Sequence, residues 1–193
     1  MMRRVIEKLQ RLWFEAWYGR RLRRLEPKAF LASPFRLDGA EGITIGASSF
    51  VQRGAWLYCC GIEGQPAVLT IGAGCEFGYN NHITAVRSVT IGNTVLTANN
   101  VYISDNAHAY ENTNIPIMHQ RVQFKKAVSI GAGSWIGENA CIIGASVGRN
   151  CVIGANAVVT SDIPDFSIAV GMPARVIRHF DETRGAWVEG ARS

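Results

Sequence analysis

A six-residue period runs through most of this chain of 193 residues and limits its possible folds more than any other feature. A position that is nearly always aliphatic recurs every six residues, and glycine usually follows it. Five rows keep the spacing: Ile45, Val51 and Leu57; Ile71, Phe77 and Ile83; Ile91, Thr97 and Ile103; Ile130, Ile136 and Ile142; Val147, Ile153 and Val159. A period of six matches neither an α-helix nor the alternation of a simple strand.

The period predicts a coil with three flat faces, one hexapeptide to a face, whose repeated side chains point inward. Small residues that follow many of these positions by four would fill the corners: Ser49, Ala55, Cys75, Ser134, Ala140, Cys151 and Ala157. We expect the glycines to accommodate the backbone torsions of the turns. One coil cannot bury its inner side alone, so coils must stack. A mainly β, parallel β-helix over residues 31–177 is therefore predicted; a β-rich domain with frequent glycine is the alternative.

Breaks in the pattern show where the chain leaves the coil. Residues 58–68 bulge between the first two rows, and Val147 follows Ile142 by five positions instead of six. Residues 104–127 lack the pattern and contain His, Asn, Pro and Lys. Long loops in compact domains are usually functional, so we expect residues 104–127 to be a functional excursion loop.

Positive charge is concentrated at the N-terminus. Residues 1–36 hold ten Lys or Arg against three Glu, whereas the net charge of the chain is +5. Residues 1–30 are expected to be a basic amphipathic helical segment, with an apolar stripe of Val5, Leu9, Leu12, Trp13, Ala16 and Trp17. This helix could lie on anionic lipid at the inner face of the membrane, or pack on the β-helix or a neighbouring subunit. No motif indicates nucleic-acid binding.

The remaining composition favours a cytoplasmic protein. No apolar run is long enough for a transmembrane helix, and the charged N-terminus does not resemble a secretory signal. The five cysteines are odd in number and form no pair of CxxC motifs, so reduced thiols and no metal site are expected. Residues 178–193 are predicted to form a short C-terminal helix and tail.

Two segments resemble hexapeptide-repeat acyltransferases. The run VSIGAGSWIGENACIIGASVGRNCVIGANAVVTSDIPDFSIAVGMPARVIR is similar to galactoside, maltose and xenobiotic O-acetyltransferases. The run VTIGNTVLTANNVYISDNAHAYENTNIPI resembles O-acetyltransferases of O-antigen, capsule and exopolysaccharide synthesis. The resemblance covers residues 30–180 and implies a left-handed β-helix, a handedness that the usual right-handed crossover would not predict. It also implies a homotrimer with active sites between subunits, acetyl-CoA as co-substrate, and O-acetylation of a sugar on a cell-envelope polysaccharide or its precursor.

The resemblance also suggests a catalytic base. O-acetyl transfer needs a base for the sugar hydroxyl and a donor for the oxyanion, and histidine is suited to the first role. The string His108-Ala109-Tyr110, followed by Ile115-Pro116-Ile117, resembles the catalytic segment of the family, so His108 is assigned as general base for direct transfer without an acyl-enzyme. Relatives often have Asp-His-x-His where this chain has Asp105-Asn106-Ala107-His108, so Asn106 takes the place of the first histidine.

Other candidate residues follow from position or from the resemblance. The acceptor candidates are Asp105, Asn106, Asn80, Asn81, His82 and His119. Asp105 could orient the imidazole or the sugar, or could be a turn residue at the end of a strand. The residues from Asn80 to His82 could face the sugar or form a corner in the αL conformation. His119 could line the acceptor pocket or be merely solvated. The cofactor candidates are Trp135, Ala155, Thr160, Arg175 and Arg178, with residues 171–174 as a closing loop. His179 is expected to be a helix residue without a role.

Two alternatives to envelope O-acetylation stay open at this point, and a third is not supported. The acceptor could be a free sugar, an amino sugar or an antibiotic. The chain could instead be a non-catalytic β-helix used for binding or as a scaffold. A zinc enzyme of the carbonic anhydrase type would need three histidines on neighbouring strands, and His82, His108 and His119 lack a convincing spacing.

Overall fold

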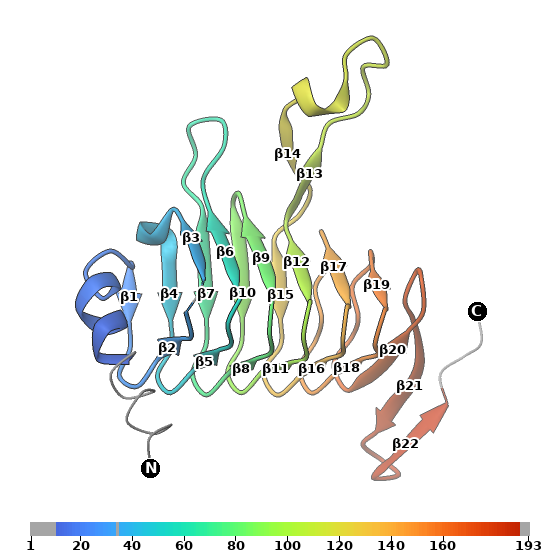
Figure 1. Ribbon diagram of the computed structural model, residues 1–193. Coiled ribbons are helices and arrows are strands. Elements are labelled where there is room, and N and C mark those ends of the chain that lie inside the picture. The colour runs from blue at the N-terminus through green and yellow to red at the C-terminus, as the bar shows by residue number, and fades with distance from the viewer. Residues whose placement is uncertain (1–10, 34, 190–193) are drawn as a thin grey trace.

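The computed structural model describes residues 11–33 and 35–189, which wind into a left-handed parallel β-helix (Figure 1). Three parallel sheets form the faces of a prism. Sheet A contains β1 (Arg24–Leu25), β4 (Ile43–Ile45), β7 (Val68–Ile71), β10 (Ser88–Ile91) and β15 (Val128–Ile130). Sheet B contains β2 (Phe30–Leu31), β5 (Phe50–Val51), β8 (Glu76–Phe77), β11 (Leu96–Thr97), β16 (Trp135–Ile136), β18 (Val152–Ile153) and β20 (Ser167–Val170). Sheet C contains β3 (Arg36–Asp38), β6 (Trp56–Cys59), β9 (His82–Ala85), β12 (Tyr102–Ser104), β17 (Cys141–Ile143) and β19 (Val158–Val159). A 3-10 turn, η1 (Ala40–Gly42), precedes β4.

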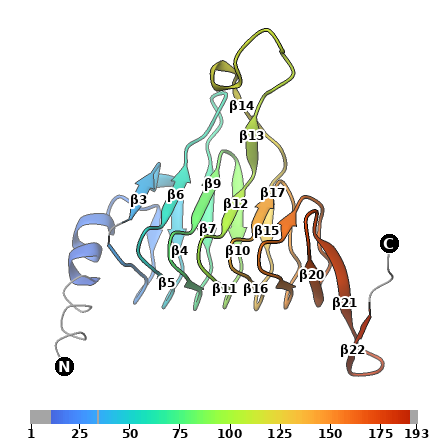
Figure 2. The ribbon, with the colours of Figure 1, turned by 45° about the vertical axis from the view of Figure 1, so that its right-hand side comes forward.

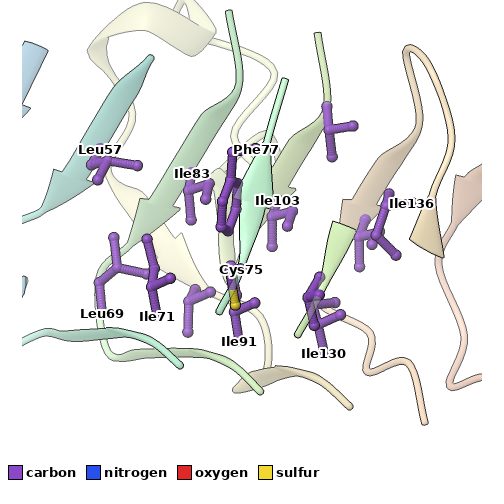
Figure 3. Packing of buried hydrophobic residues seen from close by; sticks show 14 of the residues in the cluster. Leu57, Leu69, Ile71, Cys75, Phe77, Ile83, Ile91, Ile103, Ile130 and Ile136 are labelled. Atoms are coloured by element: carbon purple, nitrogen blue, oxygen red, sulfur yellow. The ribbon is translucent and has the colours of Figure 1, made fainter. Parts of the chain in front are cut away.

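The predicted rows form the core of the prism. Every residue of the five rows is at most 2% exposed, including the polar Thr97. Equivalent residues lie directly above one another, as when Ile71 pairs with Ile91 and Ile91 with Ile130 (Figure 3). Burial of each such aliphatic side chain contributes about 1.5–3 kcal/mol. The six-residue period therefore reflects a column of stacked apolar side chains on each face.

Small polar residues close one set of corners. The Ser49 hydroxyl donates to the Gly72 carbonyl at 2.6 Å and accepts from the Cys75 amide at 3.0 Å. Ser134 repeats the arrangement with Gly148 and Cys151 at 2.8 and 3.0 Å. The predicted corner residues are all buried. The corner positions are thus small because their side chains lie inside the turn.

The glycines after the repeated aliphatic residues have a different role from the predicted one. Gly72 does not have a positive φ, and a Cβ at this position would lie 2.6 Å from the Gly92 carbonyl carbon of the next coil. Close stacking of the turns therefore requires glycine there. The left-handed torsions fall mainly on other residues, including Asn80, Asn100, Asn139 and Asn156 at the corner between sheets B and C.

The β-helix begins earlier than predicted. A first coil of β1, β2 and β3 covers residues 24–38, ahead of the first predicted row. Its inward residues Leu25, Leu31 and Leu37 keep the six-residue spacing but lack the following glycine. In the part of the chain that the structure describes, the N-terminal helix covers only residues 11–18.

The helix packs on the prism through Phe14, which was not part of the predicted apolar stripe. Phe14 is fully buried and meets Phe30 and Phe35 edge-on at ring distances of 6.1 and 5.5 Å. The stripe residues Leu12, Trp13, Ala16 and Trp17 are exposed. Val5 and Leu9, also assigned to the stripe, lie outside the described residues. The described helix therefore faces the core with Phe14 and solvent with its tryptophans.

The predicted C-terminal helix is wrong. Residues 175–189 contain β21 (Arg175–Asp181) and β22 (Ala186–Glu189), which extend sheet B: β21 pairs antiparallel with β20, and β22 pairs antiparallel with β21. His179 therefore lies in a strand. Phe180 packs against Phe166 and Trp187 at ring distances of 6.4 and 5.7 Å, and the antiparallel pair covers the open edge that the last coil would otherwise present. Residues 190–193 lie outside the described residues.

The excursion is a hairpin that projects from the corner between sheets C and A (Figures 1 and 2). We call residues 105–127, between β12 and β15, the arm. It contains β13 (Asn106–His108) paired antiparallel with β14 (Val122–Phe124), and a 3-10 turn, η2 (Ile117–His119), near its tip. In the described residues, no helix has the length and apolar character needed to cross a bilayer.

Candidate active site

A buried carboxylate anchors the arm to the prism. Asp105 has no solvent exposure, and its carboxylate accepts hydrogen bonds from the backbone N–H groups of Val86, Arg87 and Ser88 at 2.8 to 3.1 Å. These residues form the turn of the preceding coil. Three donors satisfy a buried carboxylate well, and losing them would leave buried groups unpaired. Asp105 is therefore occupied by the backbone of the preceding coil and makes no hydrogen bond to His108, which favours the alternative that it is a turn residue at the end of a strand.

Asn106 continues the same network. Its Nδ2 donates to Asp105 at 3.0 Å and to the Thr84 hydroxyl at 2.9 Å. The Ser104 hydroxyl donates to the Asn106 carbonyl at 2.8 Å and accepts from its amide at 3.1 Å. The side chain that replaces the first family histidine thus fixes the direction in which the arm departs.

His108 lies at the end of β13, two residues beyond this anchor. It is exposed and pairs through the backbone with Val122 of β14. Within residues 11–33 and 35–189, its imidazole makes no hydrogen bond or ion pair, so both ring nitrogens face solvent or an incoming group. An exposed imidazole with unbonded ring nitrogens is available to accept a proton from an incoming hydroxyl.

A short ion-pair network braces the arm from the side. Glu63, in the loop between β6 and β7, bridges Arg87 at 3.3 Å and Arg121 of the arm at 3.2 Å. Arg87 also donates to the Ile62 carbonyl. At the C-terminal end of the arm, Lys126 forms an ion pair with Asp162 at 2.6 Å and holds the pKa of that carboxyl below its usual range. The predicted bulge and the predicted excursion are therefore joined.

The tip of the arm carries a shallow hollow. It has a volume of about 500 Å³ and is lined by Tyr110, Gln120 and residues 112–117. Neither His108 nor His119 lines it, although exposed His119 lies in η2 nearby. The structure therefore leaves the predicted acceptor role of His119 without a contact.

The Asn80-Asn81-His82 segment divides into three environments. Asn80 is exposed in the αL conformation and donates to Asn100 at 3.3 Å, within an asparagine ladder along the corner between sheets B and C. Asn81 is 1% exposed and fills the corner inside the coil. Its amide donates to Gly78, Thr97 and Ala98 and accepts from Val101. Asn81 is thus a corner residue and does not contact an acceptor.

His82 belongs to an aromatic stack on the outer surface of sheet C. Its ring lies parallel to that of Trp56 at 4.2 Å and 5.1 Å from Tyr102. Arg36 covers the other side of Trp56 at 4.4 Å. Burial, and then the charge of Arg36, lower the pKa of His82 below its usual range. A half-buried, neutral imidazole can present a ring nitrogen at this surface.

Two cofactor candidates lie in one row across the outer surface of sheet B. Trp135 of β16 pairs in register with Val152, Val152 with Ile168, and Ile168 with Arg178 of β21. We call this row the sheet B strip. Trp135 is 49% exposed and Arg178 is also exposed, with two half-buried apolar residues between them. Three strand spacings separate the ends by about 14 Å. The strip offers an apolar track with a guanidinium at one end, which fits the pantetheine arm and phosphates of CoA.

The other cofactor candidates lie around β19, in the last coil of the prism. Ala155 is exposed in the turn between β18 and β19, and Thr160 is exposed just after β19. The loop of residues 171–174 bonds to β19 twice, because the Val158 amide donates to the Gly171 carbonyl and the Ala174 amide to the Val158 carbonyl. Arg175 begins β21 beside this loop and is exposed. The loop thus closes over the end of sheet C.

The two halves of the candidate site lie on opposite sides of one chain. The arm leaves the prism at the corner between sheets C and A, whereas the sheet B strip lies on the face opposite that corner (Figure 1). A single chain therefore cannot bring its own His108 to its own strip.

Several contributors were not predicted. Glu63, Thr84, Arg87, Arg121 and Ile168 hold the arm or complete the strip, yet none belongs to a local motif. Their partners are distant in sequence, so only the coil register could have revealed them. Among the described residues, no group of three His, Cys, Asp or Glu side chains is placed to hold a metal ion. The five thiols are unpaired, and burial raises the pKa of Cys59 to about 11.

Comparisons with known proteins agree with this architecture. The hexapeptide repeat of succinyl-transferase, a protein family, matches residues 127–161. A Mycobacterium tuberculosis protein named as an acetyltransferase is 32% identical over 174 residues, 86% of this chain and 58% of the relative. An Escherichia coli protein named as a lipopolysaccharide biosynthesis O-acetyl transferase is 35% identical over 114 residues, 55% of this chain and 58% of the relative. The chain thus spans under two thirds of the length of these two relatives.

Solved structures share the fold. An N-acyltransferase from Bacillus cereus, in complex with dTDP and 3-hydroxybutyryl-CoA, superposes with a TM-score of 0.72 at 16% identity, covering 88% of this chain and 89% of that one. A hexapeptide-repeat acetyltransferase from Vibrio cholerae, in complex with acetyl-CoA, gives a TM-score of 0.59 at 22% identity, covering 86% and 76%. At these identities the likeness concerns the fold.

A third relative decides the family. Galactoside O-acetyltransferase of Escherichia coli is 30% identical over 154 residues, covering 77% of this chain and 72% of the relative. The match spans most of both chains, and the repeats that carry it are the coils seen in the structure. The chain therefore belongs to the hexapeptide-repeat acyltransferase family.

Proposed function

We propose that this chain is an acetyl-CoA-dependent O-acetyltransferase that modifies a sugar hydroxyl on a cell-envelope polysaccharide or its precursor. One observation carries the proposal: the chain has an exposed His108 on an arm anchored by Asp105, and the sheet B strip lies on the opposite face. The names of two Escherichia coli relatives, a galactoside and a lipopolysaccharide O-acetyltransferase, support sugar as the acceptor class. We place the reaction in the cytoplasm.

His108 acts as general base in a direct transfer. A ring nitrogen of His108 takes the proton of the sugar hydroxyl while the oxygen attacks the thioester carbonyl carbon. The tetrahedral intermediate collapses, the carbon–sulfur bond breaks, and the imidazolium returns its proton to the departing CoA thiolate. The products are the O-acetyl sugar and free CoA, and the imidazole is regenerated. A positioned base of this kind contributes about 10²–10⁴-fold to rate.

The sheet B strip holds acetyl-CoA. Trp135, Val152 and Ile168 line the pantetheine arm, and Arg178 and Arg175 meet the phosphates through charge-assisted hydrogen bonds. Ala155, at the corner between sheets B and C, and Thr160, just after β19, flank the cofactor. This assignment rests on exposure and register, because the strip is an outward apolar row that ends in the exposed guanidinium of Arg178, and exposed Arg175 lies in the same strand.

The acceptor side is smaller than first expected. Asn106 and His119 on the arm, with Asn80 and His82 beside sheet C, remain acceptor candidates. Asn81 and Asp105 leave this group, because their side chains are buried and fully bonded. The neutral imidazole of His82 can accept a hydrogen bond from a sugar hydroxyl without adding charge.

The functional unit is a homotrimer in this proposal. Each site needs His108 from one chain and a sheet B strip from a neighbour, and cyclic symmetry supplies the same pair at every interface. Mixing tests this directly: a His108→Ala chain and a Trp135→Ala/Arg178→Gln chain, each inactive alone, should regain activity when refolded together. Random mixing restores about a quarter of the sites. Equal inactivity of the mixed and separate proteins contradicts shared sites.

Turnover with a panel of acceptors tests the chemistry. Acetyl-CoA consumption is measured with nucleotide-linked, lipid-linked and polymeric envelope glycans, with free sugars and with amino sugars, and products are identified by mass. We expect O-acetylation of an envelope glycan, and its loss in His108→Ala. Exclusive N-acetylation of an amino sugar contradicts the acceptor class. Full activity of His108→Ala contradicts the base, and binding of a glycan without turnover indicates a non-catalytic protein.

A further inference from the structure

Residues 11–18 form a helix at the N-terminal end of the prism, with one face attached to the first coil and the opposite face exposed among the described residues. Phe14 is fully buried, stacks on Tyr18 at 5.5 Å, and fixes the helix to the first coil through Phe30 and Phe35. Residues 11–18 therefore form a docked element. Its outward side chains are held in fixed positions relative to the prism.

The outward face of this helix is apolar and aromatic. Leu12, Trp13 and Trp17 are 53%, 47% and 58% exposed. The two tryptophan rings lie 6.4 Å apart, so they form one contiguous surface. Clustered exposed tryptophans on a monomer mark an interaction surface, because such apolar area is costly in water. The question is which partner covers it.

Exposed cations follow the helix directly. Arg20, Arg21, Arg23 and Arg24 are all exposed within five positions. Arg24 pairs with Glu26 and Arg11 with Glu15, and Arg21 lies 5.8 Å above the Tyr18 ring. In residues 11–24, five arginines stand against one glutamate. We call Leu12, Trp13, Trp17 and these four arginines the Trp–Arg patch.

We propose that the Trp–Arg patch docks the enzyme on the surface of an anionic lipid bilayer. Tryptophan is favoured at the level of the headgroups, where its ring is partly buried and its N–H stays hydrated. Arginines beside it gain from the negative potential of anionic lipid. A helix with an apolar face and flanking cations lies in the interface plane instead of crossing the membrane.

Charge favours lipid over a second copy of the chain. Self-association of two patches about a two-fold axis would bring two arginine clusters together, and like charges at an interface oppose it. A lipid surface supplies the missing negative charge. Docking also leaves the rest of the molecule free, because the helix covers one end of the prism, away from both the arm and the C-terminal strands (Figures 1 and 2). This inference goes beyond the proposed reaction and does not depend on it.

Binding of the full chain to vesicles tests the proposal. Co-sedimentation is measured with phosphatidylcholine vesicles containing about one third phosphatidylglycerol, and with phosphatidylcholine alone. We expect binding to the anionic vesicles only, weakened by salt. Trp13→Ser/Trp17→Ser should weaken it roughly tenfold or more, whereas Trp187→Ser, which changes a tryptophan at 41% exposure in β22, should not.

A matched pair of charge variants separates the patch from the total charge. Arg20→Gln/Arg21→Gln and Arg53→Gln/Arg184→Gln each remove two exposed arginines. Only the first should lower affinity, by roughly tenfold. Circular dichroism confirms that the variants are folded. Absence of binding by the unmodified chain, equal binding to neutral vesicles, or equal loss in both charge variants overturns the proposal. So does a Trp13→Ser/Trp17→Ser protein that dissociates into smaller assemblies while still binding vesicles.

Discussion

The stacked coils and the arm are held together in opposite ways. In the coils, each inward residue lies on its equivalent in the next coil, as Ile83, Ile103 and Ile142 do along sheet C. The arm has no such column. It depends on one buried carboxylate, Asp105, and on exposed ion pairs around Glu63. Stability is therefore spread over the prism, whereas the position of the arm depends on a few polar contacts.

This difference separates folding from chemistry. The prism should tolerate substitutions at outward positions but not at inward ones, because the cost of truncating a core side chain scales with the space left unfilled. The arm can lose contacts without unfolding the prism, because the coils on either side of it pair with each other directly. Variants in the two regions should therefore differ in what they change, and four predictions test this.

The largest effect should come from the arm and should concern only rate. His108→Ala is expected to lower kcat by about 10²–10⁴-fold, because the hydroxyl loses its proton acceptor. Its melting temperature should match the unmodified chain, since His108 is exposed. Steady-state kinetics and calorimetry measure the two quantities. A large loss of stability in this variant would place His108 among the structural residues instead.

A core truncation should give the second largest effect, on stability. Ile103→Ala removes a fully buried side chain from β12 and should lower the free energy of unfolding by about 2–5 kcal/mol. Leu96→Ala, at an exposed position of β11, is the control and should cost far less. Chemical denaturation followed by circular dichroism measures both. Similar costs at the two positions would contradict a core made of stacked columns.

A change to Asp105, the anchor of the arm, should give the third largest effect. Asp105→Asn keeps the shape of the side chain but replaces one acceptor with an N–H₂ that faces backbone N–H groups. We expect a cost of about 1–3 kcal/mol, seen first as faster amide exchange in β13 and β14. Activity should fall with it. If exchange rises throughout the prism instead, then the arm and the coils unfold together and the comparison fails.

The smallest effect should come from the exposed brace. Arg121→Gln removes a contact to Glu63 in which both side chains are more than half exposed, and such pairs contribute at most about 1 kcal/mol. Exchange in the arm should rise slightly and global stability should not change. Repeating the measurement in high salt provides the control, since salt should remove the difference. A difference that persists in salt would mean that Arg121 packs through its aliphatic stem.

The prism was largely predictable because its order is periodic. Spacing alone located the five rows of inward residues from Ile45 to Val159, and all of these are buried. The first coil was only partly included in the predicted range, because Leu25, Leu31 and Leu37 lack the glycines that marked the other rows. The role of those glycines was also missed, since close approach between coils cannot be seen in a single hexapeptide.

The two ends of the described chain and the candidate site could not be predicted in the same way, because they depend on contacts between residues that are distant in sequence. β21 is a strand because it covers the edge of sheet B, not because of its own composition, so a helix was predicted there. The helix attaches through Phe14 because Phe30 and Phe35 lie beneath it, which no local pattern reveals. Asp105 bonds to residues 86–88, and that partnership exists only once neighbouring coils are in register.

The corner from which the arm departs has a consequence for how such enzymes diversify. β10 pairs with β15, and β12 with β17, as neighbouring coils although residues 105–127 intervene in the chain. The insertion thus leaves the winding undisturbed, and a cassette of different length or composition could occupy the same junction. If the proposed function holds, exchanging cassettes at this junction alters which glycan is accepted while the proposed donor-binding face is inherited unchanged.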